Sequence, residues 1–421
     1  MKTKFKYLFI IFLSLFILFI FYDTSFAENT LNISSPCAIL IDLKTGKIIY
    51  EKNSSQKMYP ASTTKVMTAI LTLENTNLTD IATVSENAVS LSSVPDGYTR
   101  AHLVTGEKIS IEDLLNVLLI PSANDAAIVL AEHISGSIEK FADKMNEKAK
   151  EIGCKNTNFT NPNGVHDDNE FTTAYDLSLI GKYAMHNEIF RNIVSKTKFT
   201  LPQTNEYKNS DREFKTTNEL LKQGEFYYPY ATGVKTGYTE YAKCCIISSA
   251  KNEDKEFLAV ILGADDETDG MRETDCINLF NFAFKNYSDK IFLPKNKIIK
   301  QIELETSDHE KQMLDIISEN EIKVTTTTLP ESLTPQINIK SNLKAPILKD
   351  SILGTISYTI DGITYTSNLI AGNNILDSNS LLYIFIALST ILLILIFTSI
   401  FQISKHKKKN KNEFLIKFYR N

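Results

Sequence analysis

An uncharged apolar segment near the C-terminus places the tightest constraint on how this chain can fold. Leu381 to Phe401 holds 21 residues without a charged side chain, which is long enough for a helix to cross a bilayer. Backbone polar groups inside lipid must bond internally, so such a segment has to be helical. Five lysines lie within residues 405–411, and a basic cluster beside a span belongs on the cytoplasmic side. We expect a membrane helix over 381–403 and a basic cytoplasmic tail over 404–421.

A second apolar run, close to the N-terminus, has the pattern of a secretory signal. Three lysines precede a run from Leu8 to Phe21, and Ser25-Phe26-Ala27 offers a cleavage site of mostly small residues. A retained anchor is the alternative, although the run is short for a span. We expect residues 1–27 to be a signal peptide and residues 28–375 to lie outside the cytoplasm.

The charge distribution argues against nucleic acid as a partner. The chain carries 45 basic and 50 acidic residues, but the signal holds three lysines and one aspartate, and residues 404–421 hold six lysines, one arginine and one glutamate. The outer part therefore keeps 35 basic and 48 acidic residues, a net charge near −13. The five cysteines include no C-x-x-C pair and the histidines no H-E-x-x-H motif, so we expect no metal or cofactor and assign no disulfide.

Three short motifs follow one another along the outer part of the chain. They are S-x-x-K at Ser62–Lys65, S-x-N at Ser122–Asn124 and K-T-G at Lys235–Gly237, a combination typical of serine acyl-transfer sites. Each motif also recurs elsewhere, for example at Ser54–Lys57 and at Lys44–Gly46, where K-T-G reads as a hairpin turn. Order and structural context therefore select the first set.

The first motif precedes an apolar pattern with helical spacing. Ser62 would lie at the first turn of that helix, where N–H groups and the helix dipole stabilise negative charge. Lys65 is three residues further on, so its amine can reach the same face. A serine hydroxyl needs a base to become a good nucleophile, and a desolvated lysine can serve. The alternative is a helix-capping serine beside a solvated lysine.

The second motif lies between two helical patterns, 111–119 and 125 onward, which Pro121 separates. A turn there can direct side chains into a cleft. Ser122 could relay a proton, and Asn124 could hold Lys65 and bond a substrate amide. The alternative is that either residue caps the second helix.

The third motif comes just before two buried strand patterns, 244–249 and 257–262, so it lies on or beside a strand. A strand edge offers backbone groups to an extended peptide. A surface hairpin turn is the alternative.

The side chains of this third motif suit an anionic peptide end. Lys235 adds positive charge, Thr236 a hydroxyl for a carboxylate, and Gly237 room for close approach. The N–H of Tyr238 could join that of Ser62 as an oxyanion hole.

Strand and helix patterns predict an α+β catalytic domain over 28–289, with an antiparallel sheet flanked by helices. From about residue 290 the pattern changes to short strands, which predicts a small β-sandwich over 290–375 and a polar linker before the membrane helix. The patterns within the first domain are a hairpin at 37–51, a helix-rich middle at 62–196, strands at 233–262 and a closing helix at 274–286.

With the three motifs in this order, the chain resembles the low-molecular-mass penicillin-binding proteins, and most closely the serine-type D-alanyl-D-alanine carboxypeptidases. The resemblance is strong over about residues 35–290 and looser in the β-rich tail. It implies the penicillin-binding/β-lactamase-like transpeptidase fold. The stretches that carry it are Tyr59–Ala69, Pro121–Ala127, Phe159–Gly164, Thr172–Leu177 and Thr232–Thr239.

The resemblance implies a reaction and a role for each motif residue. Ser62 would attack the bond between the two terminal D-alanines of a peptidoglycan stem peptide, form an acyl-enzyme and release D-alanine; β-lactams would acylate the same serine. Lys65 would be the base and Ser122 a proton shuttle. Asn124, Gly237 and Tyr238 would contact substrate, and the terminal carboxylate would be bound by Lys235, Thr236 and Arg272. An ordinary surface arginine is the alternative for Arg272.

Two rival functions stay open. A β-lactamase shares the first and third motifs, but Glu170 is only a nominal candidate for its deacylating glutamate. Glu170-Phe171 also stands where the family often has a His-Tyr pair, which bears on substrate fit. An inert wall-binding scaffold is the second rival, and the intact Ser62 and Lys65 disfavour it. The sequence assigns no oligomeric state.

Overall fold

The structure is a computed structural model that describes residues 31–208, 212–265, 267, 270–307, 309–327, 333–360 and 362–418. The expected signal peptide, 1–27, lies outside the described residues. The chain forms two compact units; the first ends at Asn286 and the second begins at Tyr287. This boundary lies three residues before the one expected from the strand pattern.

The sheet of the first unit has five antiparallel strands in the order β2-β1-β9-β8-β7. Strands β1 and β9 pair with Ile39 opposite Val260, so strands from both ends of the unit form one sheet, as predicted. The Lys44–Gly46 stretch is the turn of the first hairpin, in which the Thr45 hydroxyl donates to Asp42 Oδ1 at 2.6 Å. The strands are β1 (Cys37–Asp42), β2 (Ile48–Lys52), β7 (Ala231–Thr239), β8 (Lys243–Asn252) and β9 (Lys255–Ala264).

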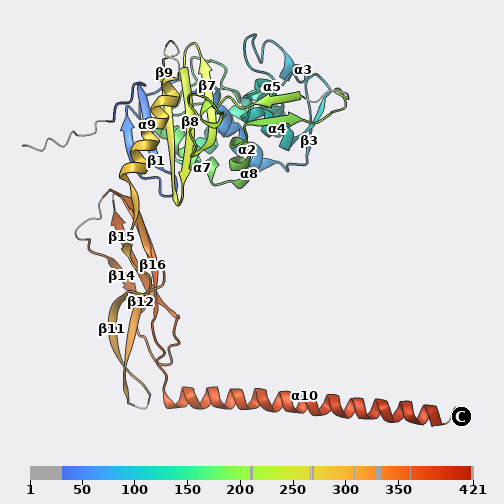
Figure 1. The fold of residues 1–421 in the computed structure, drawn as a ribbon, viewed down its shortest axis with the longest axis vertical. Coiled ribbons are helices and arrows are strands. Elements are labelled where there is room, and N and C mark those ends of the chain that lie inside the picture. The colour runs from blue at the N-terminus through green and yellow to red at the C-terminus, as the bar shows by residue number, and fades with distance from the viewer. Residues whose placement is uncertain are drawn as a thin grey trace, which may run out of the picture. The chain divides into compact units, whose positions relative to one another are not determined.

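Helices cover both faces of this sheet, because side chains alternate between faces along each strand. From β9, Leu258, Val260 and Leu262 join the larger core with helix α7 (Ala174–Met185). Phe257, which directly precedes Leu258 and so lies on the opposite face of the sheet, packs against Phe284 of α9 (Met271–Asn286), with ring centroids 5.1 Å apart. Figure 1 shows α9 lying across the sheet opposite the helical region.

The helical region follows the predicted patterns closely. Helix α4 begins after Ser110, whose hydroxyl caps it by accepting from Asp113 N–H at 3.1 Å. Two short hairpins, β3–β4 and β5–β6, were not predicted, because strands of three or four residues carry too little periodic signal. The elements are η1 (Ala61–Thr64), α2 (Lys65–Asn75), β3 (Ile81–Thr83), α3 (Glu86–Val89), β4 (Lys108–Ser110), α4 (Ile111–Leu119), α5 (Asn124–Ser135), α6 (Ile138–Ile152), α8 (Glu188–Val194), β5 (Lys198–Leu201), β6 (Arg212–Lys215) and η2 (Glu219–Leu221).

The second unit is the expected all-β domain. A five-stranded sheet, β11-β12-β16-β15-β14, and a two-stranded sheet, β10-β13, share one apolar core that includes Leu314, Val324 and Leu369. Strands β10 and β12 were not predicted. The strands are β10 (Ser288–Leu293), β11 (Ile298–Glu305), β12 (Lys311–Ser318), β13 (Ile322–Thr326), β14 (Gln336–Ile339), β15 (Ile352–Ile360) and β16 (Ile363–Ala371).

The last element is one long helix, α10 (Ser378–Phe418). It contains a candidate membrane span, Phe385–Ile403, with a mean hydropathy of 2.4 and no buried residue. The helix begins three residues before the predicted span and continues through most of the basic tail, so the tail is helical where it is described.

Candidate active site

Ser62 lies in the single turn η1, and Lys65 begins α2 directly after it. The Lys65 side chain is fully buried, and its amine lies 2.8 Å from Ser62 Oγ. The same amine donates to Asn124 Oδ1 at 2.9 Å and to the carbonyl of Asn163 at 2.5 Å. Three oxygens therefore fix the amine beside the serine hydroxyl.

The surroundings of Lys65 favour its uncharged form. Burial lowers the pKa of the Lys65 amine well below its ordinary value, and the charge of Lys235 lowers it further, whereas Glu170 and Asp125 raise it. Removing an ammonium from water is costly, and this cost dominates. An uncharged amine within hydrogen-bonding distance of a hydroxyl can take its proton.

Ser122 and Asn124 come from the turn between α4 and α5. Ser122 has a left-handed backbone, with φ of 70°, and its side chain is 6% exposed. Such a backbone is uncommon for a residue with a side chain and is often found at functional sites. Asn124 also donates from Nδ2 to the carbonyl of Thr99 at 2.9 Å, which orients its amide oxygen toward Lys65.

The third motif lies within β7, which is the edge strand of the sheet. A Cβ at Gly237 would lie 2.9 Å from the backbone nitrogen of Ser62, so a glycine is needed for β7 to pass this close to the serine. Tyr238, the next residue, is 52% exposed.

The other two residues of the motif form the polar end of the site. Lys235 is 1% exposed, and burial, followed by the charge of Arg272, lowers its pKa to about 7. The hydroxyl of Thr236 lies 2.5 Å from that of Thr217. Arg272 completes this end; its guanidinium donates to the Gly237 carbonyl at 3.3 Å and to Glu273 at 2.7 Å.

These residues border one cleft of about 440 Å³. Its lining combines the hydroxyl of Thr236 and the guanidinium group of Arg272 with the two serines, Ser62 and Ser122. Lys65 and Lys235 lie just behind this surface. The predicted residues that line the cleft are Ser62, Ser122, Asn124, Thr236, Gly237, Tyr238 and Arg272.

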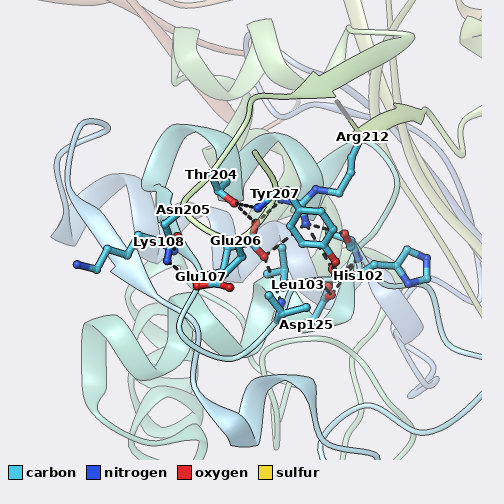
Figure 2. Close-up of polar contacts among 12 residues, drawn as sticks. His102, Leu103, Glu107, Lys108, Asp125, Thr204, Asn205, Glu206, Tyr207 and Arg212 are labelled. Carbon is cyan, nitrogen blue, oxygen red and sulfur yellow. Dashed lines mark hydrogen bonds and ion pairs between the residues drawn. The ribbon is translucent and has the colours of Figure 1, made fainter. Parts of the chain in front are cut away.

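Residues 96–99 form one wall of the cleft. The residues that follow them, 101–107, are fixed by a buried polar network (Figure 2). The Asp125 carboxylate accepts from the N–H groups of Ala101 and Leu103 at 2.9–3.2 Å. Glu107, which is fully buried, forms an ion pair with Arg212 of β6. Tyr207 donates from its hydroxyl to the carbonyl of His102 at 2.8 Å. The loop before β6 therefore holds the wall whose Thr99 carbonyl orients Asn124.

Comparison with known proteins agrees with this geometry. Residues 24–266 match the family model described as D-alanyl-D-alanine carboxypeptidase. This chain belongs to the D-alanyl-D-alanine carboxypeptidase family. Members are serine peptidases of the penicillin-binding class, and residues 287–376 match the penicillin-binding protein 5 C-terminal domain.

Individual relatives cover most of the chain. D-alanyl-D-alanine carboxypeptidase DacF of Bacillus subtilis (strain 168) is 34% identical over 77% of this chain and 81% of its own. Penicillin-binding protein 5 of Haemophilus influenzae is 28% identical, with a TM-score of 0.61, over 82% of this chain and 98% of its own. The Streptomyces K15 DD-transpeptidase is 32% identical, with a TM-score of 0.56, over 60% of this chain and 98% of its own.

Several residues of this carboxypeptidase-family site were not predicted as site residues from sequence. Thr217 and Thr99 border the cleft, and Asn163 contributes a carbonyl rather than a side chain. None of them belongs to a motif with chemical meaning of its own. Asn163 did fall within the Phe159–Gly164 stretch on which the family resemblance partly rests.

Proposed function

We propose that this protein is a membrane-anchored D,D-carboxypeptidase that removes the terminal D-alanine from peptidoglycan stem peptides through an acyl-enzyme on Ser62. The observation that carries this proposal is the contact of 2.8 Å between Ser62 Oγ and the buried, hydrogen-bonded amine of Lys65. A nucleophile paired with a neighbouring base is the arrangement that covalent acyl transfer requires.

In the acylation step, Ser62 Oγ bonds to the carbonyl carbon of the penultimate D-alanine while its proton passes to Lys65 Nζ. The oxygen that becomes negative is stabilised by the N–H groups of Ser62 and Tyr238, in keeping with the close approach of β7 to η1. The C–N bond then breaks, and the leaving amine takes the proton through Ser122. D-alanine departs and an ester remains.

In the second step, water hydrolyses this ester. The water oxygen bonds to the acyl carbon, one water proton passes to Lys65 Nζ, and the bond between the acyl carbon and Ser62 Oγ breaks. Ser62 regains the proton from Lys65 as the shortened peptide leaves. A β-lactam would follow the first step, with its ring C–N bond broken in place of the peptide bond.

The polar end of the cleft explains a preference for a free C-terminus. Lys235, Thr236 and Arg272 lie together there, and a substrate carboxylate would favour the charged form of Lys235, whose pKa is near 7 in its absence. Binding the carboxylate there places the preceding peptide bond toward Ser62.

The proposed location follows from the two apolar segments. The predicted signal at 1–27 would export the chain, and the span within α10 would hold it in the membrane with the basic tail in the cytoplasm. The catalytic unit would then work on the outer side, where stem peptides are found.

Intact-mass analysis of the full chain in detergent, incubated with penicillin or with a diacyl-Lys-D-Ala-D-Ala peptide, tests this function. We expect one penicilloyl adduct on Ser62 and release of D-alanine, both absent from Ser62→Ala. Rapid penicillin turnover without D-alanine release would identify a β-lactamase instead. Folded protein that gives neither adduct nor release would point to the inert scaffold.

A further inference from the structure

Glu170 is a buried carboxyl close to the catalytic amine that the reaction above does not use. Its side chain is 2% exposed, and it lies between the Asn161–Gly164 turn and helix α7. It does not line the cleft. A buried carboxyl is costly unless it is hydrogen-bonded or protonated, so its partners indicate what it does.

Glu170 contacts the two segments that flank the Lys65 amine. Its Oε1 accepts from the buried Thr64 hydroxyl at 3.0 Å, and Thr64 directly precedes Lys65. Its Oε2 lies 3.5 Å from Asn161 Nδ2. One carboxyl therefore joins the start of α2 to the turn at 161–164.

That turn supplies the carbonyl on which the Lys65 amine rests. Asn161 Oδ1 accepts from the N–H groups of Asn163 and Gly164 at 3.2 and 2.7 Å, which shapes the turn. The Asn163 carbonyl then accepts from Lys65 Nζ at 2.5 Å. Displacing Asn161 would move this acceptor and loosen the amine from Ser62.

Two titratable groups face Glu170: Lys65 from α2 and Asp167 from its own loop. Burial raises the pKa of Glu170 to about 8, and Asp167 also raises it, whereas Thr64, Asn161 and Lys65 lower it. Lys65 is in turn faced by Lys235 and Asp125. A pKa of about 8 favours the protonated carboxyl at neutral pH. In that form Oε2 can still accept from Asn161, and the Thr64 hydroxyl, which can both donate and accept, can receive the acid proton.

We propose that Glu170 is a positioning residue: it clamps the 161–164 turn to the start of α2 and so excludes water from the Lys65 amine and keeps that amine in contact with Ser62. This inference rests on the proposed acyl transfer. It also separates the protein from a glutamate-dependent β-lactamase, because a carboxyl behind the cleft surface, bonded to Thr64, cannot activate water at the acyl group.

Two substitutions test the clamp, with penicillin acylation and deacylation of the full chain in detergent measured from pH 5 to 10. Glu170→Gln keeps one donor and one acceptor in the same shape, so we expect both rates within about threefold of the wild type. Glu170→Ala opens space beside Thr64 for water. Because hydration favours the ammonium form, the acid limb of its acylation profile should move to higher pH, with acylation at pH 7 falling at least tenfold.

Asp168→Asn is the matched control, since it makes the same carboxyl-to-amide change at an exposed position of the same loop; we expect an unchanged profile. A long-lived acyl-enzyme in Glu170→Gln would overturn the proposal and make Glu170 a base. If the acid limb of the acylation profile of Glu170→Ala stays at the wild-type pH, the proposal is overturned as well, whatever the change in melting temperature.

A readout independent of turnover separates this inference from the proposed function. Titration of the Lys65 side chain by NMR, with ¹³C-labelled lysine and a Lys65→Arg variant for assignment, should show a higher pKa in Glu170→Ala and little change in Glu170→Gln. If the wild type is not acylated, the proposed function fails and this titration still decides the clamp. Equal Lys65 titrations in all three proteins would contradict it.

Discussion

Lys65 and Lys235 are both at most 1% exposed, although lysine is rarely buried unless it is paired. Among the described residues neither amine contacts a carboxylate; their acceptors are the Ser62 hydroxyl, the Asn124 amide and backbone carbonyls. Neutral acceptors stabilise an ammonium less than a carboxylate does, so burial prevails and both pKa values fall. At the scale of residues, the proposed reactivity of Ser62 therefore depends on the lack of a carboxylate in contact with the Lys65 amine.

Placing a carboxylate at position 124 should therefore suppress acylation. In Asn124→Asp the new charge would lie about 3 Å from Lys65 Nζ and would raise the pKa of the amine, so the base would stay protonated at pH 7. We expect acylation to fall by about 100-fold at pH 7 and to recover as the pH rises, measured by intact mass over a pH series.

Asn116→Asp is the control for that substitution. Asn116 is also buried and accepts from a lysine, Lys196 Nζ, at 2.8 Å, but it does not line the cleft. Its acylation profile should match the wild type. If the acid limb of the acylation profile of Asn124→Asp lies at the same pH as in the wild type, Lys65 is not the base.

Gly237 carries a second prediction at this scale. A Cβ there would meet Ser62 N, Ala61 Cβ and Thr63 N at 2.9–3.1 Å, so Gly237→Ala must push β7 away from η1. We expect a loss of about 1–3 kcal/mol in stability and acylation at least tenfold slower. Gly224→Ala, where a Cβ meets only ordinary contacts, should change neither; equal behaviour of the two variants would refute the close approach.

At the scale of elements, the cleft depends on a loop distant in sequence from the motifs. The segment 96–107, whose first four residues form the cleft wall, has no helix of its own between α3 and β4. Contacts with Asp125 and with the β5–β6 hairpin hold it in place (Figure 2). The guanidinium carbon of Arg212 also lies 4.0 Å from the centre of the Tyr207 ring, which favours the cation. The short β5–β6 hairpin thus supports the orientation of Asn124.

Removing Arg212 should destabilise the catalytic unit because Glu107 would remain buried and unpaired. We expect Arg212→Met to cost about 3–5 kcal/mol and to slow acylation, and the double variant with Glu107→Gln to regain part of the loss. The melting temperature and the acylation rate measure the two effects.

Arg191→Met is the comparison, since the Arg191–Glu256 pair is more exposed, at 34% and 15%. Solvent screens such a pair, so its loss should cost about 1 kcal/mol or less. Similar losses of stability in Arg191→Met and Arg212→Met would show that the buried Glu107–Arg212 pair stabilises the catalytic unit no more than the more exposed Arg191–Glu256 pair does.

At the scale of the whole molecule, the two units and α10 have separate sources of stability. The catalytic unit has its core around the five-stranded sheet, and the β-rich unit has a core of its own. The candidate span in α10 has no buried residue, so its apolar side chains have no protein core to enter. A lipid environment is the partner that suits them.

Deleting α10 tests this arrangement. A chain that ends at Asp377 should leave carbonate-washed membranes for the soluble fraction and keep its acylation rate, because none of the predicted site residues lies beyond Arg272. A chain that lacks only residues 404–421 should stay with the membrane. Membrane retention of the chain that ends at Asp377 would place the anchor elsewhere.

The sequence by itself determined the family resemblance, the order of the three motifs and the type of most long elements, although the eight-residue strand β12 was not predicted. Periodicity is strong over helices such as Ile111–Leu119 and buried strands such as β9, since each residue there reports on one face. Short elements such as β3 and β5 were missed because three or four residues give little periodic pattern.

Only the tertiary structure decided what surrounds Lys65. Its acceptors come from Asn124, 59 residues away, and from the Asn163 carbonyl, 98 residues away, and a backbone carbonyl carries no side-chain signature. The structure also shows that Glu170, which the sequence offers only as a nominal deacylating base, is buried and hydrogen-bonded to Thr64. Burial and neighbouring charge set a pKa, and both depend on contacts between segments that are distant in the sequence.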